Sequence, residues 1–197
     1  MVQVRMGKSK PSAPMRPSPC LPPDSPLRAL DYLALDDAAL IDQCEVDHYR
    51  SSGPGGQKRN KTSSAVRLRH RPTDLIVTAS ENRSQHVNKV FALRRLREAI
   101  ALEVRTAVDL SSAAAGDAFA ECVTADGDFK VRKSDRRYYQ ALSEILHVLA
   151  ACGMSVSDAA GRLGLSTARL VKLIRSDPKL WRRVNQMRAV AGAKPLR

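Results

Sequence analysis

The chain has 197 residues, of which 43% are apolar. This allows one or two small domains with a hydrophobic core and excludes a large multidomain enzyme. The formal net charge of +13 and the isoelectric point near 10.1 indicate a polyanionic partner, RNA or DNA. No apolar run approaches the ~20 residues that a membrane helix needs, so we expect no membrane partner.

The cysteines lie far apart, with no CxxC pair and no nearby histidine at the spacing of a zinc site. We therefore expect reduced thiols in a cytoplasmic compartment, with no metal site and no cofactor. The four histidines form no triad with a visible nucleophile and acid, and we interpret them as structural or surface residues. The cysteines are Cys20, Cys44, Cys122 and Cys152.

Positive charge is concentrated in two blocks that acidic segments separate. Residues 50–71 carry seven Lys or Arg and no acid, and residues 129–197 carry fifteen Lys or Arg against four Asp or Glu. Residues 32–49 and 106–128 each carry five acids and no Lys or Arg. We divide the chain into a disordered, Pro-rich basic tail (1–31), a small α+β domain (32–105), an acidic linker (106–131) and a basic all-α domain (132–197).

Local signals place the first elements in chain order. Asp36 can cap a short helix over residues 35–44, and residues 45–49 alternate as a strand does. Residues 65–70 and 75–79 also read as strands, and the turn between them predicts a hairpin.

Longer helical patterns follow the hairpin. Ser84 can cap a helix from Gln85 to about Val104, whose apolar residues recur at helical spacing. Ser134 or Asp135 can cap a second helix, which Gly153 is placed to end. On the first of these helices we expect three cations at the surface, Arg94, Arg95 and Arg97.

The next segment reads as a helix-turn-helix. Gly164 supplies a tight turn, and Ser166 can cap a second helix that reaches Arg175. Asp177 and Pro178 are typical of the N-cap and first residue of a final helix. We expect a cationic surface made of Arg169, Lys172 and Arg175, extended by Lys179, Arg182, Arg183 and Arg188.

The stretch YRSSGPGGQKRNKTSSAVRLRHR, residues 49–71, combines three glycines and a glutamine with seven cations. Glycine permits backbone angles closed to other residues and lets the chain approach RNA closely. Cations without any acid suit a phosphate-rich surface. The pattern therefore indicates a loop of defined shape that contacts RNA. The alternative is a disordered Gly-rich linker.

Residues 35–104 contain, in this order, SGPGGQ, the basic Asn-Lys-Thr stretch, two strands and the helix start RSQHVNK. With this series they resemble the catalytic domain of class I peptide chain release factors. Stand-alone, codon-independent peptidyl-tRNA hydrolases of ribosome rescue are the nearest form. The resemblance implies a small domain of antiparallel strands with a long helix. It also implies a catalytic loop containing Gly55, Gly56 and Gln57, which enters the peptidyl transferase centre.

The resemblance further implies a monomer whose partners are the ribosome, its large-subunit rRNA and peptidyl-tRNA. The glutamine amide can orient a water molecule or stabilise the leaving ribose hydroxyl. With the basic outer face of the helix-turn-helix added, the expected RNA-binding residues are Arg50, Lys58, Arg59, Lys61, Arg67, Arg69, Arg83, Gln85, Lys89, Arg169, Lys172 and Arg175.

Two departures from the family pattern matter. The 34 residues before Leu35 cannot hold a codon-recognition domain, so we expect no stop-codon reading. Asp74 stands where the family often has a turn glycine. The alternative function, from another class, is a nucleic-acid-binding regulator in which the helix-turn-helix reads a duplex and the GGQ domain is not catalytic.

Overall fold

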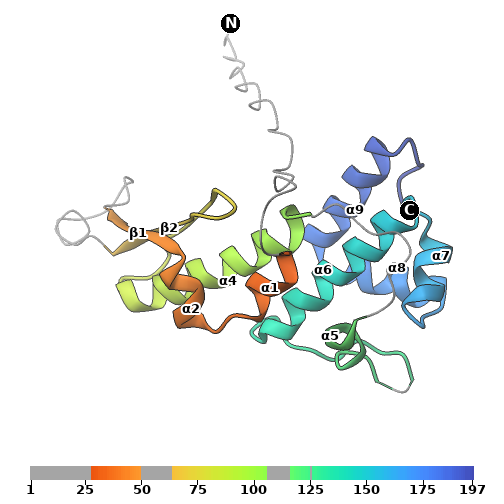
Figure 1. The fold of residues 1–197 in the computed structure, drawn as a ribbon, viewed down its shortest axis with the longest axis horizontal. Helices are drawn as coiled ribbons and strands as arrows, with labels where there is room; N and C mark the ends of the chain where they lie inside the picture. The colour runs from red at the N-terminus through yellow and green to blue at the C-terminus, as the bar shows by residue number, and fades with distance from the viewer. Residues whose placement is uncertain (1–27, 50–63, 106–115, 125) are drawn as a thin grey trace, which may run out of the picture.

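The computed structural model of the chain describes residues 28–49, 64–105, 116–124 and 126–197. The sheet lies at one end of the long axis, α7 and α8 lie at the other, and α4 and α6 run between them (Figure 1). No helix among these residues is long and apolar enough to span a membrane. The elements are α1 (Ala29–Ala34), α2 (Asp37–Asp42), β1 (Cys44–Tyr49), β2 (Ala65–His70), β3 (Leu75–Ala79), α4 (Gln85–Glu103), α5 (Asp117–Ala120), α6 (Arg136–Ala151), α7 (Val156–Arg162), α8 (Thr167–Ser176) and α9 (Pro178–Val190).

The strands form one antiparallel sheet in the order β1-β2-β3, which confirms the predicted hairpin and the α+β class. Strand alternation buries Val66 and Leu68 on the inner face, where β2 packs against α4. The hairpin turn places Asp74 at φ 55°, the left-handed region that glycine enters most easily. A glycine would adopt this geometry without strain, so Asp74 occupies a turn position that suits glycine.

Helix α4 is buried from two sides. It packs against β2 and β3 and also against α1 and α6, so its buried residues do not follow a single stripe. Ser84 accepts a hydrogen bond from the Val87 amide at 3.4 Å and caps the helix as predicted. The buried residues of α4 are Asn88, Ala92, Leu93, Leu96, Arg97, Ile100, Ala101 and Leu102.

Two short helices extend the ordered structure beyond the predicted elements. Helix α1 packs against α4 and α6, and its Leu33 is fully buried. Helix α5 packs against α6 and buries Phe119, whose ring stacks on Phe129 with centroids 6.4 Å apart. The buried apolar residues of the sheet and of the helices belong to one cluster. The division into four parts stays a prediction.

The helical elements after residue 131 are confirmed. Asp135 caps α6 by accepting a hydrogen bond from the Arg137 amide at 2.9 Å, and Gly153 follows the helix with φ 56°. Gly164, at φ 67°, makes the turn between α7 and α8. Ser166 caps α8 by accepting from the Arg169 amide at 3.3 Å. The arrangement is a helix-turn-helix-like pair.

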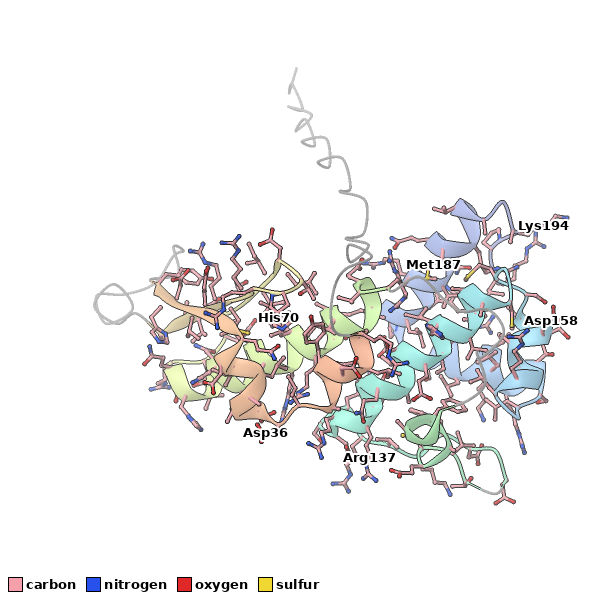
Figure 2. The ribbon with its side chains drawn as sticks, viewed as in Figure 1. Asp36, His70, Arg137, Asp158, Met187 and Lys194 are labelled. Atoms are coloured by element: carbon pink, nitrogen blue, oxygen red, sulfur yellow. The ribbon has the colours of Figure 1, made fainter. Side chains whose placement is uncertain are left out.

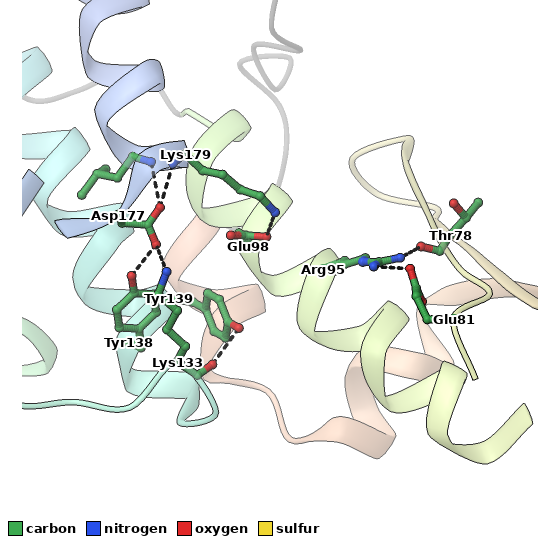
Figure 3. A network of polar contacts seen from close by, with 10 residues as sticks. Thr78, Glu81, Arg95, Glu98, Lys133, Tyr138, Tyr139, Asp177 and Lys179 are labelled. Atoms are coloured by element: carbon green, nitrogen blue, oxygen red, sulfur yellow. Dashed lines mark hydrogen bonds and ion pairs between the residues drawn. The ribbon is translucent and has the colours of Figure 1, made fainter. Parts of the chain in front are cut away.

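Asp177 joins three helical segments. Its Oδ1 accepts hydrogen bonds from the Lys179 and Leu180 amides at 2.9 and 3.1 Å, which caps α9. Its Oδ2 accepts from Lys133 Nζ at 2.7 Å and from the Tyr138 hydroxyl at 2.6 Å (Figure 3). Burial alone would raise the pKa of Asp177, but these four hydrogen bonds outweigh it and lower the pKa to about 2. The carboxylate is therefore charged throughout the neutral range.

Helix α9 is in turn fastened to α4. The Lys179 ammonium donates to a Glu98 carboxylate oxygen at 2.5 Å, as Figure 3 shows. Arg183 Nε donates to the Leu102 carbonyl at 2.9 Å, and its guanidinium pairs with Glu103 at 3.4 Å. The C-terminal turn of α4 thus gains both a donor for an end carbonyl and a positive charge.

Arg97 does not lie at the surface, contrary to the sequence-based expectation. Its side chain is only 5% exposed and donates to the carbonyls of Leu33 and Leu35 at 3.1 and 2.8 Å. It also donates to Asp37 Oδ1 at 3.0 Å. A buried guanidinium needs such partners, and here they come from the end of α1 and the start of α2. Arg97 therefore ties both short helices to α4.

We predict that Arg97→Met lowers the free energy of unfolding by about 2–4 kcal/mol, because methionine replaces the stem but leaves the Leu33 and Leu35 carbonyls without this donor. Arg94→Met is the matched control, since Arg94 is exposed on the same helix, and we expect a change below about 0.5 kcal/mol. Urea unfolding measures both. Equal midpoints and slopes for the two variants would contradict this role of Arg97.

Candidate functional site

The predicted catalytic residues Gly55, Gly56 and Gln57 lie outside the described residues, as do Arg50, Lys58, Arg59 and Lys61. We call residues 50–63 the GGQ segment. The structure describes what holds it on both sides, because Tyr49 at the end of β1 pairs directly with Ala65 at the start of β2. Opposed residues of antiparallel strands lie only about 5 Å apart. The GGQ segment therefore begins and ends at adjacent points on one edge of the sheet.

A buried asparagine fixes the downstream end of this segment. Asn88 of α4 is fully buried, and its Nδ2 donates to the carbonyls of Ser64 and Asn82, both at 2.7 Å. Its Oδ1 accepts from the Asn82 amide at 2.9 Å. Ser64 directly follows the GGQ segment. One side chain thus connects the end of the segment, the turn before α4 and the first turns of α4.

Asn88 is not among the site residues predicted from the sequence, although its neighbours Arg83, Gln85 and Lys89 are. Around the start of α4, Arg83 and Gln85 are exposed and Lys89 is half-buried. A signal for Asn88 existed, because it precedes the buried Ala92 and Leu96 by four and eight residues. A polar residue on such an apolar stripe indicates a buried side chain that needs hydrogen-bond partners.

The two arginines predicted on β2 are paired with acids. Arg67 and Arg69 lie on the outer face of the sheet, about half exposed. Arg67 contacts Asp47 Oδ2 with Nη2 at 2.7 Å and Nε at 3.0 Å. Arg69 contacts Asp74 at 2.7 Å and Glu45 at 3.4 Å. A phosphate approaching this face would compete with three carboxylates, which weakens the field of both arginines.

The predicted C-terminal cations form a separate group. Arg169, Lys172 and Arg175 are exposed on α8, at the opposite end of the molecule from the β1–β2 edge (Figure 1). Within the part of the chain that the structure describes, no carboxylate lies within ion-pair distance of any of the three. The Arg175 guanidinium lies over the Trp181 ring, 5.2 Å from its centroid.

Most of the predicted α9 cations are engaged within the chain. Lys179 is exposed but pairs with Glu98, and the Arg183 side chain is 11% exposed. Arg188 donates from Nε to the Lys194 carbonyl at 2.8 Å and from Nη1 to the Met154 carbonyl. These three cations serve the packing of α9. Arg182 is exposed.

The hydroxyl–imidazole contact between Thr73 and His70 is buried, so it is closed to a substrate. Buried His70 places Nδ1 2.7 Å from Thr73 Oγ1 and Nε2 3.1 Å from Gln43 Oε1 (Figure 2). Burial, with a smaller effect of Arg71, lowers the pKa of His70 to about 4. Burial raises the pKa of Cys44 to about 11, so this thiol is not a thiolate. Within the same ranges no three His, Cys, Asp or Glu side chains gather in a way that could hold a metal ion.

Comparison with known proteins identifies the family. The RF-1 domain matches residues 40–141, just over half of the chain. The chain is 49% identical over 70 residues to peptide chain release factor 2 of Buchnera aphidicola subsp. Baizongia pistaciae, covering 34% of this chain and 19% of that protein. It is 60% identical over 53 residues to peptide chain release factor 1 of Rubrobacter xylanophilus, covering 27% and 15%. It is 43% identical over 79 residues to peptide chain release factor 2 of Neisseria meningitidis serogroup C, covering 38% and 22%.

The chain therefore belongs to the RF-1 domain family, which is the GGQ domain of class I release factors, and the resemblance seen in the sequence is confirmed. The chain spans about a fifth of the length of these relatives. The family match begins within α2 and ends within α6. It includes the sheet, the GGQ segment and α4, while α7, α8 and α9 lie beyond it.

We predict that the free energy of unfolding falls by about 3 kcal/mol between pH 6.5 and pH 4 because of His70. The folded state keeps His70 neutral down to pH about 4, whereas the unfolded chain binds the proton below about pH 6.5, so acid favours unfolding. His70→Gln removes this titration. Urea unfolding at a series of pH values should therefore show a fall that is smaller by about this amount in the variant. Parallel pH profiles would contradict the assignment.

We also predict that Asn88→Asp loosens the downstream end of the GGQ segment. The carboxylate cannot donate, so it faces the Ser64 and Asn82 carbonyls as an acceptor and costs about 2–3 kcal/mol. Amide exchange should quicken at residues 64–67 more than at residues 68–70. Ser84→Ala is the control, because it removes the α4 cap, worth about 1 kcal/mol, without touching Ser64. Uniform acceleration in both variants would reduce Asn88 to a general stability residue.

Proposed function

We propose that this chain hydrolyses the ester bond of peptidyl-tRNA on the ribosome, through Gly55, Gly56 and Gln57. One observation carries the proposal: the Gly-Gly-Gln tripeptide lies within the RF-1 domain match, between the paired ends of β1 and β2. The partners are the large-subunit rRNA and peptidyl-tRNA, and the protein acts as a monomer in the cytoplasm. The matched relatives are peptide chain release factors, which supports a role in translation termination.

The proposed reaction is attack of water on the peptidyl ester carbonyl. The peptide leaves as a carboxylic acid, and the ribose hydroxyl of tRNA takes up a proton. The Gln57 amide supplies a donor and an acceptor, so it orients water or stabilises the developing charge without acting as a general base. Gly55 and Gly56 allow close approach of backbone to RNA. The cations Arg50, Lys58, Arg59 and Lys61 bind surrounding phosphates.

The release is proposed to be independent of a stop codon. Similarity to the release factors is confined to 53–79 residues in the three relatives, about the GGQ domain. Residues 142–197 follow that match with a basic helical region instead. We infer that this region, rather than a codon-reading domain, directs the chain to ribosomes that have stalled.

A second candidate function is a nucleic-acid-binding regulator. The observation in its favour is the helix-turn-helix-like pair α7 and α8 with three exposed cations on the second helix. Ribosome pelleting separates the two functions. The hydrolase must sediment with 50S or 70S particles, whereas a regulator that reads a duplex has no reason to do so.

We predict that Gln57→Ala keeps ribosome binding and lowers release of peptide from ribosome-bound peptidyl-tRNA by ~100- to 1,000-fold, the usual effect of removing one oxyanion donor. Gly56→Ala should also slow release, because it adds a Cβ where the backbone must approach RNA. Gln140→Ala on α6 is the control for a glutamine outside the site. Release at the unaltered rate by both loop variants would exclude Gly56 and Gln57 from catalysis.

A further inference from the structure

The outer side of α8 is open to a partner around Lys172 and Arg175, whereas the Arg169 side chain also packs against Gly127. Leu170 and Ile174 are fully buried and fix the inward side of the helix. Arg169, Lys172 and Arg175 recur every three residues and are all exposed. At 3.6 residues per turn these three side chains form one row along about 9 Å of helix. The neighbouring α9 contributes the exposed Arg182.

This row differs electrostatically from the two arginines of the sheet, Arg67 and Arg69. Arg67 and Arg69 each lie 2.7 Å from a carboxylate oxygen, so much of their field ends on acids of the same chain. No described carboxylate lies within ion-pair distance of Arg169, Lys172 or Arg175. Of the described cations named as RNA contacts, the α8 row is therefore less compensated by acids than the two arginines of the sheet, and it lies far from them.

One cation of the row is also preorganised. The Arg175 guanidinium lies over the Trp181 ring, 5.2 Å from its centroid, which restricts its orientation. Trp181 is half-buried and belongs to α9, whose first turn Asp177 caps. A guanidinium held in this way loses less side-chain entropy when it binds a phosphate.

The row is connected to the GGQ segment through ordered structure. Asp177 joins α9 to α6 through Tyr138, and Lys179 joins α9 to α4 (Figure 3). Arg183 makes a second link between α9 and α4. Helix α4 has 19 residues, about 28 Å in length, and its first turn carries Asn88, which binds Ser64 beside the start of β2. The α8 row and the β1–β2 edge lie at opposite ends of the molecule (Figure 1).

We propose that the row Arg169, Lys172 and Arg175 binds RNA backbone phosphates and anchors the protein at a fixed distance from the point where the GGQ segment acts. This inference rests on the proposed function, which makes the polyanion RNA. The major groove of A-form RNA is too narrow for a helix, so α8 contacts phosphates along the backbone and reads no bases. The anchor raises occupancy of the ribosome, and the chemistry takes place at the other end.

The test compares two double variants of the full chain, Lys172→Glu with Arg175→Glu and Lys194→Glu with Arg197→Glu. Both lower the net charge by four units, because each substitution changes it by two. Lys194 (Figure 2) and Arg197 are exposed and follow the end of α9, outside α8. Non-specific attraction to a polyanion would respond equally to both pairs, whereas an anchor responds only to the first.

For the first pair we expect affinity for ribosomes carrying peptidyl-tRNA to fall at least about tenfold at physiological salt. The slope of log affinity against log salt should flatten by about 0.7–0.9 for each lost contact. The release rate at saturating protein should stay unchanged, so the effect lies in KM and not in kcat. Equal losses in both pairs, or a lower kcat alone, would overturn the anchor.

Two further measurements keep the outcome clear. Lys172 makes no contact that stabilises the fold. We therefore expect Lys172→Glu alone to weaken ribosome binding while thermal unfolding is unchanged, and we expect Lys194→Glu not to weaken binding. A 20-base-pair RNA hairpin and the DNA duplex of the same sequence are the second probe, and tighter binding of DNA through the row overturns the RNA assignment. If the unaltered protein binds through the row but releases no peptide, the proposed hydrolase function fails while the anchor stands.

Discussion

Burial of α4 from both sides is the constraint on which the rest of the structure depends. The sheet covers one side, α1 and α6 cover the other, and buried side chains go around the helix. Burying a long helix on two sides leaves little room for its polar residues, which must find partners inside. Asn88 finds them at the start of α4 and Arg97 in the middle. The end carbonyl of Leu102 finds Arg183 of α9. Helix α4 therefore links the two ends of the molecule, together with α1, which packs on α6 and places Tyr32 against His70 of β2.

This arrangement makes the basic helical region part of the same folded body as the sheet. Leu142, Ile145 and Leu149 of α6 are buried in the cluster that also contains Leu68 of β2. Removing the chain beyond α5 would expose that cluster, at a cost of about 25 cal/mol for each Å² of apolar surface. Loss of activity after such a truncation would report unfolding as much as loss of docking. Charge reversal at Lys172 of α8 separates the two effects, because this side chain is exposed and is not part of the cluster.

Signals within a few residues of one another predicted most of the fold. Asp36, Ser84 and Asp135 each accept a hydrogen bond from an amide two or three residues later, so sequence alone identifies these caps. Long-range partners were invisible to the same reasoning. Arg97 binds carbonyls 62 and 64 residues away, and Asn88 binds Ser64 from 24 residues away. For the candidate site, the Gly-Gly-Gln tripeptide was found from its residue types, whereas the support beneath it depends on a fold that brings distant segments together.

Pairing on the sheet shows why a list of cations does not locate an RNA surface. The sequence places Arg67 and Arg69 in a run free of acids, but cross-strand neighbours come from elsewhere in the chain, and β1 sets Asp47 and Glu45 opposite them. Asp74 adds a third carboxylate at a turn position with φ 55°. A glycine there would satisfy the backbone and leave Arg69 with one acid fewer. Asp74 at this turn thus reduces the free positive charge of the sheet, whereas Lys172 and Arg175 of α8 have no described carboxylate at ion-pair distance.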